Sequence, residues 1–214
     1  AASEGDTINV GPGTYEGVIN INKSVDLIGP GVEAVEQAQI LSDCDWVLNI
    51  TASDVSVQGF ILADDLYGEC YPLVRIDSNV SSVTITENEI FGGYRGINLR
   101  HDSNNNTITN NVIHDNSTGI SIGGSQNNTI SNNEIYENSD GILLRQDGCV
   151  GEECFGNVSG NVIDNNNIHD NFGDGISGQS DITFSELAIS ENDITDNEGY
   201  GIYFDGIESG NLTI

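Results

Sequence analysis

The chain has 214 residues, of which 34 are acidic and 5 are basic, so its formal net charge at pH 7 is −29. This charge excludes nucleic acid as a natural partner, because phosphate binding needs a basic face. No apolar stretch approaches the roughly 18 residues of a membrane-spanning helix, so we expect no membrane-spanning segment. The acidity is typical either of adaptation to high salt or of a cell-surface protein that recruits divalent cations.

Residues 1–82 predict the first, irregular coils of the chain. The run at residues 6–10 (DTINV) alternates polar and apolar residues, which is typical of a strand, and no amphipathic helix precedes it. The opening at residues 1–3 (AAS) is typical of a mature terminus after removal of a signal peptide. We therefore expect a secreted chain that begins directly with β structure.

From residue 83 to residue 214 the sequence repeats a unit centred on one asparagine. The tightest copies are 22 and 23 residues apart, and the five asparagines are Asn88, Asn111, Asn133, Asn166 and Asn192. An isoleucine lies three residues before and two residues after each one, and a Gly-Ile pair follows. Alternating runs predict three short strands per unit. Such a unit cannot bury its apolar side alone, so we expect the units to stack as coils around an isoleucine interior.

The recurring asparagine is expected at a sharp bend between two strands. Asparagine tolerates the left-handed backbone region that a tight corner needs. In register, its amide can hydrogen bond to the amides of the coils above and below, roughly 4.8 Å away. We therefore expect an internal asparagine ladder that holds the coils together and binds no ligand.

The pattern GI-x-[IL] … N-x-x-I-x-x-N-x-I-x-x-N, clearest from Val83 to Phe204, resembles that of the right-handed parallel β-helix proteins with the pectin-lyase-like fold. The resemblance implies an all-β chain, a right-handed single-stranded parallel β-helix of roughly eight coils. We expect one domain over residues 1–214, with an insertion loop at about residues 146–160. The fold hosts lyases, hydrolases, esterases, adhesins and inert fibres, so it implies no single function.

The resemblance also implies a place for function, because catalysis and glycan binding in this family usually lie on the outer face of the strand that begins at Gly-Ile. Alternation along that strand predicts one outward column made of Arg75, Asn98, Ser121, Leu143, Ser177 and Tyr203. It predicts a second made of Asp77, Arg100, Gly123, Arg145, Gln179 and Asp205. From these columns the ligand-binding candidates are Arg75, Asn98, Arg100, Arg145, Gln179, Tyr203 and Asp205.

Two interpretations of the arginines stay open. In the first, Arg100 and Arg145 stand two coils apart, roughly 9.6 Å, in a groove over Gly123 that also includes Gln179 and Asp205, and they grip an acidic sugar as the candidate catalytic residues of a lyase. In the second, Arg100 pairs with Asp77 and Arg145 pairs with Asp147 or a glutamate of the insertion loop, without a ligand. The combined catalytic signatures of the polygalacturonases, pectin methylesterases and pectate lyases of this fold do not occur in the chain.

No resident cofactor and no confident metal site are expected. His114 and His169 occupy equivalent places in coils too far apart to share one ion, and His101 stands apart from both. Acidic turns offer oxygen ligands to weakly bound calcium, although no EF-hand pattern is present. These turns carry Asp164, Asp170, Asp174, Asp181, Asp193 and Asp196.

Cysteines and sequons indicate an extracellular or cell-surface location. The expected pairing is Cys44 with Cys70 and Cys149 with Cys154, although three connectivities are possible, and disulfides imply an oxidising compartment. Eight N-x-[ST] sequons are candidate glycosylation sites, some of them expected by chance in an asparagine-rich repeat. They are Asn22, Asn49, Asn79, Asn105, Asn116, Asn127, Asn157 and Asn211.

Two functions fit these observations. The favoured one is a non-catalytic structural or adhesive β-helix that assembles through its open ends into a fibre, sheath or surface layer. Residues 211–214 (NLTI) repeat the strand start at residues 106–108 (NTI), so unpaired edges are expected at both ends unless the chain is part of a longer protein. The alternative is a carbohydrate-active protein, either a lyase or hydrolase of acidic polysaccharide or a glycan-binding module, that uses the Gly-Ile strand face.

Overall fold

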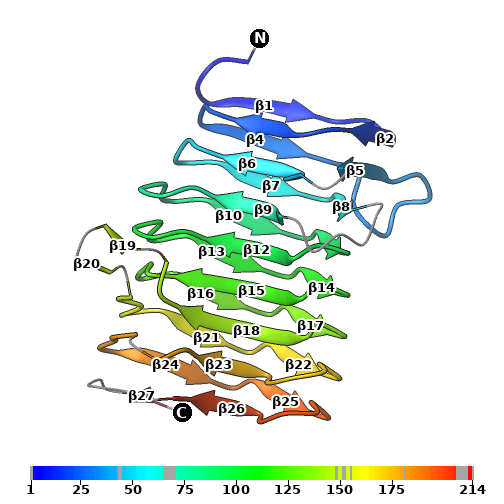
Figure 1. Ribbon diagram of the computed structural model, residues 1–214. Helices are drawn as coiled ribbons and strands as arrows, with labels where there is room; N and C mark the ends of the chain where they lie inside the picture. The colour runs from blue at the N-terminus through cyan, green and yellow to red at the C-terminus, as the bar shows by residue number, and fades with distance from the viewer. Residues whose placement is uncertain are drawn as a thin grey trace.

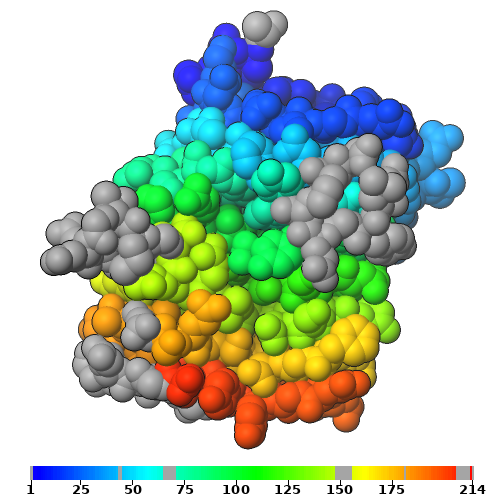
Figure 2. Space-filling view, in the orientation of Figure 1, coloured from blue at the N-terminus to red at the C-terminus, as the bar shows by residue number. Residues whose placement is uncertain are grey.

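The computed structural model describes residues 2–42, 45–64, 71–147, 149–150, 153–154, 156–180, 182–205 and 212–213. Within this part of the chain there are 27 strands and no helix, and thus no helix long and apolar enough to cross a membrane. Each strand of the stack pairs in parallel with strands one coil away, and the two termini lie at opposite ends (Figure 1). Figure 2 shows the same stacking on the surface as successive colour bands.

Three parallel sheets run along the stack. The first sheet contains β1 (Asp6–Asn9), β4 (Val25–Ile28), β7 (Ser56–Gln58), β10 (Thr84–Thr86), β13 (Thr107–Thr109), β16 (Thr129–Ser131), β21 (Val162–Asp164), β24 (Leu187–Ser190) and β27 (Leu212–Thr213). The second contains β2 (Gly13–Glu16), β5 (Ala38–Ser42), β8 (Ile61–Asp64), β11 (Glu89–Phe91), β14 (Val112–His114), β17 (Glu134–Tyr136), β22 (Asn167–His169) and β25 (Asp193–Thr195). The third contains β3 (Ile19–Ile21), β6 (Leu48–Ile50), β9 (Pro72–Ile76), β12 (Arg95–Leu99), β15 (Thr118–Gly123), β18 (Asp140–Arg145), β23 (Ile176–Gly178) and β26 (Ile202–Phe204). The all-β parallel helix of roughly eight coils is confirmed.

Isoleucines fill the interior, one column for each sheet. In the first sheet the register joins Ile85, Ile108, Ile130, Ile163 and Ile189, and all five are at most 2% exposed. Burying one such side chain stabilises the fold by roughly 1.5–3 kcal/mol. The isoleucine columns offer no polar group to a ligand, and the buried asparagines at the corners hydrogen bond to one another, so ligand chemistry is left to the outward side chains.

The corners differ from the expectation in one respect. The residue in the left-handed region is the one before the ladder asparagine, with φ between 52° and 56° at Glu87, Asn110, Asn132, Asn165 and Glu191. The asparagine itself turns its amide inward, where it is buried. The sharp bend and the ladder are therefore carried by two neighbouring residues, not by one.

An asparagine ladder runs along each of the three corners. Between the first and second sheets the Nδ2 of Asn88 donates to Oδ1 of Asn111 at 3.2 Å, and Asn111, Asn133 and Asn166 continue the series at 2.9–3.0 Å to Asn192. A second ladder joins Asn116, Asn138, Asn171 and Asn197. A third, which the sequence analysis did not predict, joins Asn106, Asn128 and Asn161. The expected internal ladder is thus confirmed and found to be threefold.

The insertion after β18 carries a hairpin that projects from the side of the stack (Figure 1). Its strands β19 (Cys149–Val150) and β20 (Glu153–Cys154) pair antiparallel, with Cys149 and Cys154 as register partners. This backbone arrangement suits the predicted Cys149–Cys154 pairing, which stays a prediction. Cys44 and Cys70 lie outside the described residues.

Candidate functional site

The outer face of the third sheet presents the two predicted columns. The register joins Arg75 to Asn98, then to Ser121, Leu143, Ser177 and Tyr203, as expected from alternation. In the second column Gly123 pairs with Arg145. The absence of a side chain at Gly123 is required there, because an added Cβ would lie 2.8 Å from Cβ of Asp147 and 3.2 Å from Nη2 of Arg145.

A third column, which sequence reasoning missed, lies at the start of the same strands. The register places Pro72, Arg95, Thr118 and Asp140 side by side. The last three precede the Gly of a Gly-Ile pair, and so do Asp174 and Tyr200 in the next coils. In the sequence this position resembled part of the turn. The change from arginine in an early repeat to aspartate in later repeats was nevertheless visible there.

Four arginines meet in one pocket at the N-terminal half of this face. The pocket has a volume of about 420 Å³, and we call it the cationic pocket; it is lined by Trp46, Pro72, Arg75, Arg95, Asn98, Arg100, Arg145 and Asp147. The chain has five basic residues, so Lys23 is the one basic residue outside the lining. Their convergence in a protein of charge −29 makes this pocket a place where an anion meets positive charge.

Asp147 holds two of these arginines in place. Its Oδ2 lies 3.1 Å from Nε of Arg100 and its Oδ1 lies 3.0 Å from Nη1 of Arg145. Arg145 also donates to Ser121 at 2.8 Å and to Asn98 at 3.1 Å. The side chain of Arg145 is only 12% exposed whereas that of Arg100 is 32% exposed, so Arg100 is the more accessible of the two.

The carboxylate of Asp147 is stabilised in its charged form. Burial by itself raises the pKa of Asp147, but the backbone N–H of His101, which donates to Oδ2 at 3.0 Å, and the charges of Arg145 and Arg100 outweigh burial. The pKa of Asp147 therefore lies below its ordinary value of 3.8. The neutralising interpretation is thus correct for Arg145, whereas Arg100 lies closer to Asp147 than to the expected Asp77, which is 3.8 Å away. A pocket lies beside these ion pairs as well.

The remaining wall of the cationic pocket combines arginine with aromatic rings. Arg75 pairs with Asp77 at 2.7 Å, and its guanidinium lies 4.6 Å from the ring centre of Trp46. The ring of Trp46 packs edge-on against that of Tyr71, which is 47% exposed. Rings beside cations are suited to sugars that carry acidic groups, since the apolar ring face packs on C–H groups while the cation binds the acid.

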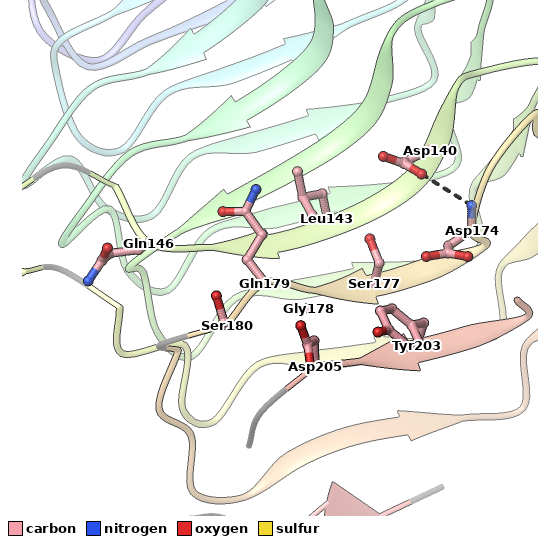
Figure 3. Close-up of a pocket in the computed structure, with 10 residues that line it drawn as sticks. All are labelled: Asp140, Leu143, Gln146, Asp174, Ser177, Gly178, Gln179, Ser180, Tyr203 and Asp205. Atoms are coloured by element: carbon pink, nitrogen blue, oxygen red, sulfur yellow. Dashed lines mark hydrogen bonds between the residues drawn. The ribbon is translucent and has the colours of Figure 1, made fainter. Parts of the chain in front are cut away.

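A second pocket lies at the C-terminal half of the same face (Figure 3). Its volume is about 580 Å³, and we call it the acidic pocket; it is lined by Asp140, Leu143, Gln146, Asp174, Ser177, Gly178, Gln179, Ser180, Tyr203 and Asp205. Figure 3 shows Asp140 and Asp174 beside each other at one end and Gln146 at the other. The rings of Tyr203 and Tyr200 stack at 5.1 Å next to this pocket, and both are well exposed.

Asp140 holds its proton more tightly than an ordinary carboxyl group. Burial and the nearby charge of Asp174 raise the pKa of Asp140 above its ordinary value of 3.8, although the backbone N–H of Asp174 donates to its Oδ1 at 3.1 Å and opposes the shift. A carboxyl group with a raised pKa is suited to proton transfer.

The structure corrects the expectation of one continuous groove. Arg100 and Arg145 line the cationic pocket, whereas Gln179, Tyr203 and Asp205 line the acidic pocket. The boundary between the two pockets falls at the start of the insertion. Gln146 lines the acidic pocket, and the next residue, Asp147, lines the cationic pocket. The predicted candidates are therefore brought to one face but in two sites of opposite charge.

The histidines and acidic turns form no metal site in the described part of the chain. No group of three or more His, Cys, Asp or Glu residues is placed there to hold an ion. His114 and His169 instead belong to a stack of flat rings on the second sheet, with centres 5.0–5.3 Å apart, that contains Phe91, His114, Tyr136 and His169. Asp181 lies outside the described residues.

Burial divides the candidate glycosylation sites. Asn116 is 4% exposed, and its amide already donates to Ile90, His114 and Asn138, so a glycan at this ladder position is incompatible with the fold. Asn49 is 9% exposed and donates to Asn20, which also argues against it. Asn211 lies outside the described residues. The exposed candidates are Asn22, Asn79, Asn105, Asn127 and Asn157.

Comparison with known proteins agrees with this architecture. The family model described as "Right handed beta helix region" matches residues 73–214, which is more than half of the chain. The protein belongs to the right-handed β-helix family. No curated protein sequence matches it.

Similar solved structures are mostly those of carbohydrate-active β-helix enzymes. The A-module of mannuronan C-5 epimerase AlgE4 from Azotobacter vinelandii superposes with a TM-score of 0.65 at 18% identity, covering 98% of this chain and 68% of that one. The catalytic unit of a GH87 α-1,3-glucanase from Streptomyces thermodiastaticus gives 0.64 at 20%, covering 92% of this chain, which spans only 36% of that unit. An alginate lyase from Paenibacillus gives 0.53 at 14%, covering 97% and 94%. At these identities the likeness shows the fold alone.

Proposed function

We propose that this β-helix protein binds an acidic polysaccharide along the outer face of its third sheet. One observation carries the proposal: four of the five basic side chains of a chain of charge −29 line a single pocket beside the only tryptophan. If so few basic residues were placed at random, they would be spread over the three sheets and would not meet in one pocket. The solved structures of carbohydrate-active proteins with the same fold support the assignment without specifying a substrate.

Arg100 and Arg145 act in this proposal as binding groups. A guanidinium stays protonated in proteins and donates hydrogen bonds, and both side chains are oriented as donors by Asp147. The sequence-based role of the two arginines as a catalytic base is therefore not retained in the proposal. Their charges instead lower the free energy of an acidic sugar in the pocket.

A second candidate function is cleavage of the same polysaccharide over the acidic pocket. It is favoured by Asp140, whose raised pKa suits a general acid, next to the carboxylate of Asp174. Both pockets share strand β18, which carries Asp140 at its start and Arg145 at its end. A polysaccharide chain held in one pocket therefore extends naturally across the other.

The setting that we propose for this activity is extracellular. Predicted disulfides, exposed sequons and a polysaccharide ligand all fit a secreted or cell-surface protein. Self-assembly into a fibre or surface layer remains a separate prediction, supported by no contact among the described residues. Electron microscopy of the native protein tests it, because filaments or a lattice are expected if the ends associate.

Affinity electrophoresis tests the binding proposal. At low ionic strength the protein is run through gels that contain alginate, polygalacturonate or a neutral glucan, and retardation by an acidic polymer is expected. Arg100→Gln should weaken this binding about tenfold, because one of the four positive charges of the pocket is lost. Lys23→Gln is the matched control, since it makes the same change in net charge outside the pocket. Equal weakening by both variants, or no retardation by any polymer, would contradict the proposal.

A further inference from the structure

Arg95 differs from the other arginines of the cationic pocket. Arg75, Arg100 and Arg145 each form an ion pair with an aspartate. The guanidinium of Arg95 lies over the ring of Tyr94 at 4.4 Å and is 3.4 Å from its hydroxyl oxygen, and no carboxylate pairs with it among the described residues. Its charge is therefore the least compensated of the four.

One atom of the Arg95 side chain also lacks a hydrogen-bond partner. Its Nε is buried and, within the described part of the chain, has no hydrogen-bond partner. A buried donor without a partner is rare in folded proteins, because the cost of removing it from water is not recovered. This unpaired donor adds to the cost of the uncompensated charge of Arg95, so the fold by itself does not favour an arginine at this position.

The surroundings of Arg95 favour an anion. Burial lowers the pKa of Arg95, and the positive charge of Arg145 lowers it further, against weaker opposing contributions from Tyr94 and Asp147. Even so, a guanidinium remains protonated near neutral pH. Arg95 as a whole is only half-buried and lines the pocket, so an acidic group bound here would compensate its charge.

We propose that Arg95 is the residue that binds the acidic group of the polysaccharide, and that this group is a sugar carboxylate. The assignment rests on the proposed function, and it names the specificity-determining residue of that site. The planar fork of a guanidinium matches the two oxygens of a carboxylate in a bidentate pair. The other three arginines, fixed by Asp77 and Asp147, form the wall against which this pair is made.

Position along the stack adds a limit on the substrate. Arg95 and Asp140 occupy the same column two coils apart, which is roughly 9.6 Å. Asp140, Asp174 and Asp205 line the acidic pocket that follows, and they repel a second carboxylate. The preferred ligand therefore carries its carboxylate at the cationic pocket and uncharged sugars beyond it, as in a partly esterified polyuronate or a mixed polysaccharide.

The first experiment needs no ligand. We compare the melting temperatures of the wild type, Arg95→Met and Lys23→Met. Arg95→Met keeps an apolar stem and removes both the unpaired donor and the charge, so its melting temperature should be higher by about 2–4 °C. Lys23→Met should not reproduce this gain. A melting temperature for Arg95→Met below that of the wild type would show that the side chain serves the fold, and the inference would be overturned.

The second experiment measures affinity by calorimetry at low salt, using polygalacturonate oligosaccharides in three forms: free acid, partly methyl-esterified and fully methyl-esterified. The wild type should bind the partly esterified form most tightly and the fully esterified form at least tenfold more weakly. Arg95→Met should lose this tenfold discrimination, whereas Lys23→Met should keep it.

The outcomes separate the two proposals. Equal affinity of the wild type for all three forms would refute the carboxylate assignment and leave polysaccharide binding intact. Retention of discrimination by Arg95→Met would assign the carboxylate to another residue. Tighter binding of a sulfated neutral glucan than of any uronate would refute the carboxylate in favour of a sulfate. Failure of every polymer to bind would refute the proposed function itself.

Discussion

The two halves of the third-sheet face share one backbone geometry and differ in charge and in how that charge is held. In the N-terminal half, Asp147 pairs with Arg100 and Arg145 and Asp77 pairs with Arg75, whereas Arg95 has no carboxylate partner among the described residues. In the C-terminal half, three aspartates line a larger pocket without a basic residue in its lining. Equivalent positions of the repeat can therefore carry side chains of opposite charge. The register of the coils fixes where a side chain lies but does not restrict which side chain it is.

The opposite charges also produce opposite effects on ionisation. Burial raises the pKa of Asp140, and the charge of Asp174 raises it further. Burial acts in the same direction on Asp147, but the N–H of His101 and the charges of Arg145 and Arg100 outweigh it and lower the pKa. A polysaccharide that crosses both halves meets first a site for an anion and then a site for uncharged groups. Four changes test this difference between the two halves.

The largest expected effect comes from Asn138→Ala, because strand β18 begins just after this ladder position and serves both pockets. Asn138 is fully buried and donates to Ile113, Tyr136 and Asn171. Its loss leaves several buried groups unpaired and should reduce the free energy of unfolding by about 3–5 kcal/mol. Chemical denaturation measures this, with Asn110→Ala at an exposed corner as a milder control. Loss of ligand binding in both pockets together is expected; loss in one alone would contradict the shared role of β18.

Asp147→Asn should be the next most damaging and should affect only the cationic half. It removes the charge that Arg100 and Arg145 share, at a cost of about 2–3 kcal/mol, less than for a fully buried pair because Arg100 is partly exposed. Since the folded-state pKa of Asp147 lies below 3.8, its stabilisation is present above that value and is lost as pH falls through the folded-state pKa. Denaturation curves of variant and wild type should therefore differ at neutral pH and converge in acid. A constant difference across pH would refute the ion-pair explanation.

Asp140→Asn should act in the opposite direction. The folded-state pKa of Asp140 is raised above 3.8, so its favourable contribution is complete below 3.8 and is lost as pH rises through the folded-state pKa. Asparagine keeps the acceptor for the N–H of Asp174 and cannot ionise. The variant should match the wild type in acid and exceed its stability at neutral pH by about 1 kcal/mol or less, since the site is partly exposed to solvent. A variant less stable at neutral pH would show that the carboxylate is needed for the fold.

Tyr203→Ala should have the smallest effect and should change binding rather than folding. Tyr203 is 41% exposed and stacks on Tyr200 at the acidic pocket. Loss of an aromatic surface for a sugar ring should weaken polysaccharide binding about threefold to tenfold. Calorimetry measures this with the partly esterified ligand, and Tyr15→Ala on the second sheet is the control. If both substitutions weaken binding equally, the ligand does not extend over the acidic pocket.

Much of the fold was predictable from the repeat. The period of about 22 residues, the isoleucines at fixed spacing and the Gly-Ile pairs specified parallel coils, their register and two of the three outward columns. Arg75, Asn98 and Tyr203 therefore lie where alternation placed them. The third column was missed because Arg95 and Asp140 precede a glycine, a position that resembled a turn. The single groove was wrong because nothing in the repeat shows that Gln146 and Asp147 face different pockets.

Local sequence determined what depends on near neighbours: strand period, corners, coil length and the inward or outward direction of most side chains. Only the tertiary structure decided what depends on residues brought together from different coils. Asp147 reaches Arg100, 47 positions earlier, and Arg145 reaches Asn98 across a similar separation. Asn106, Asn128 and Asn161 form a ladder only because insertions of different length still return each coil to the same corner. Such contacts arise because the coils stack in register. Stacking brings four arginines that are far apart in the sequence into one pocket.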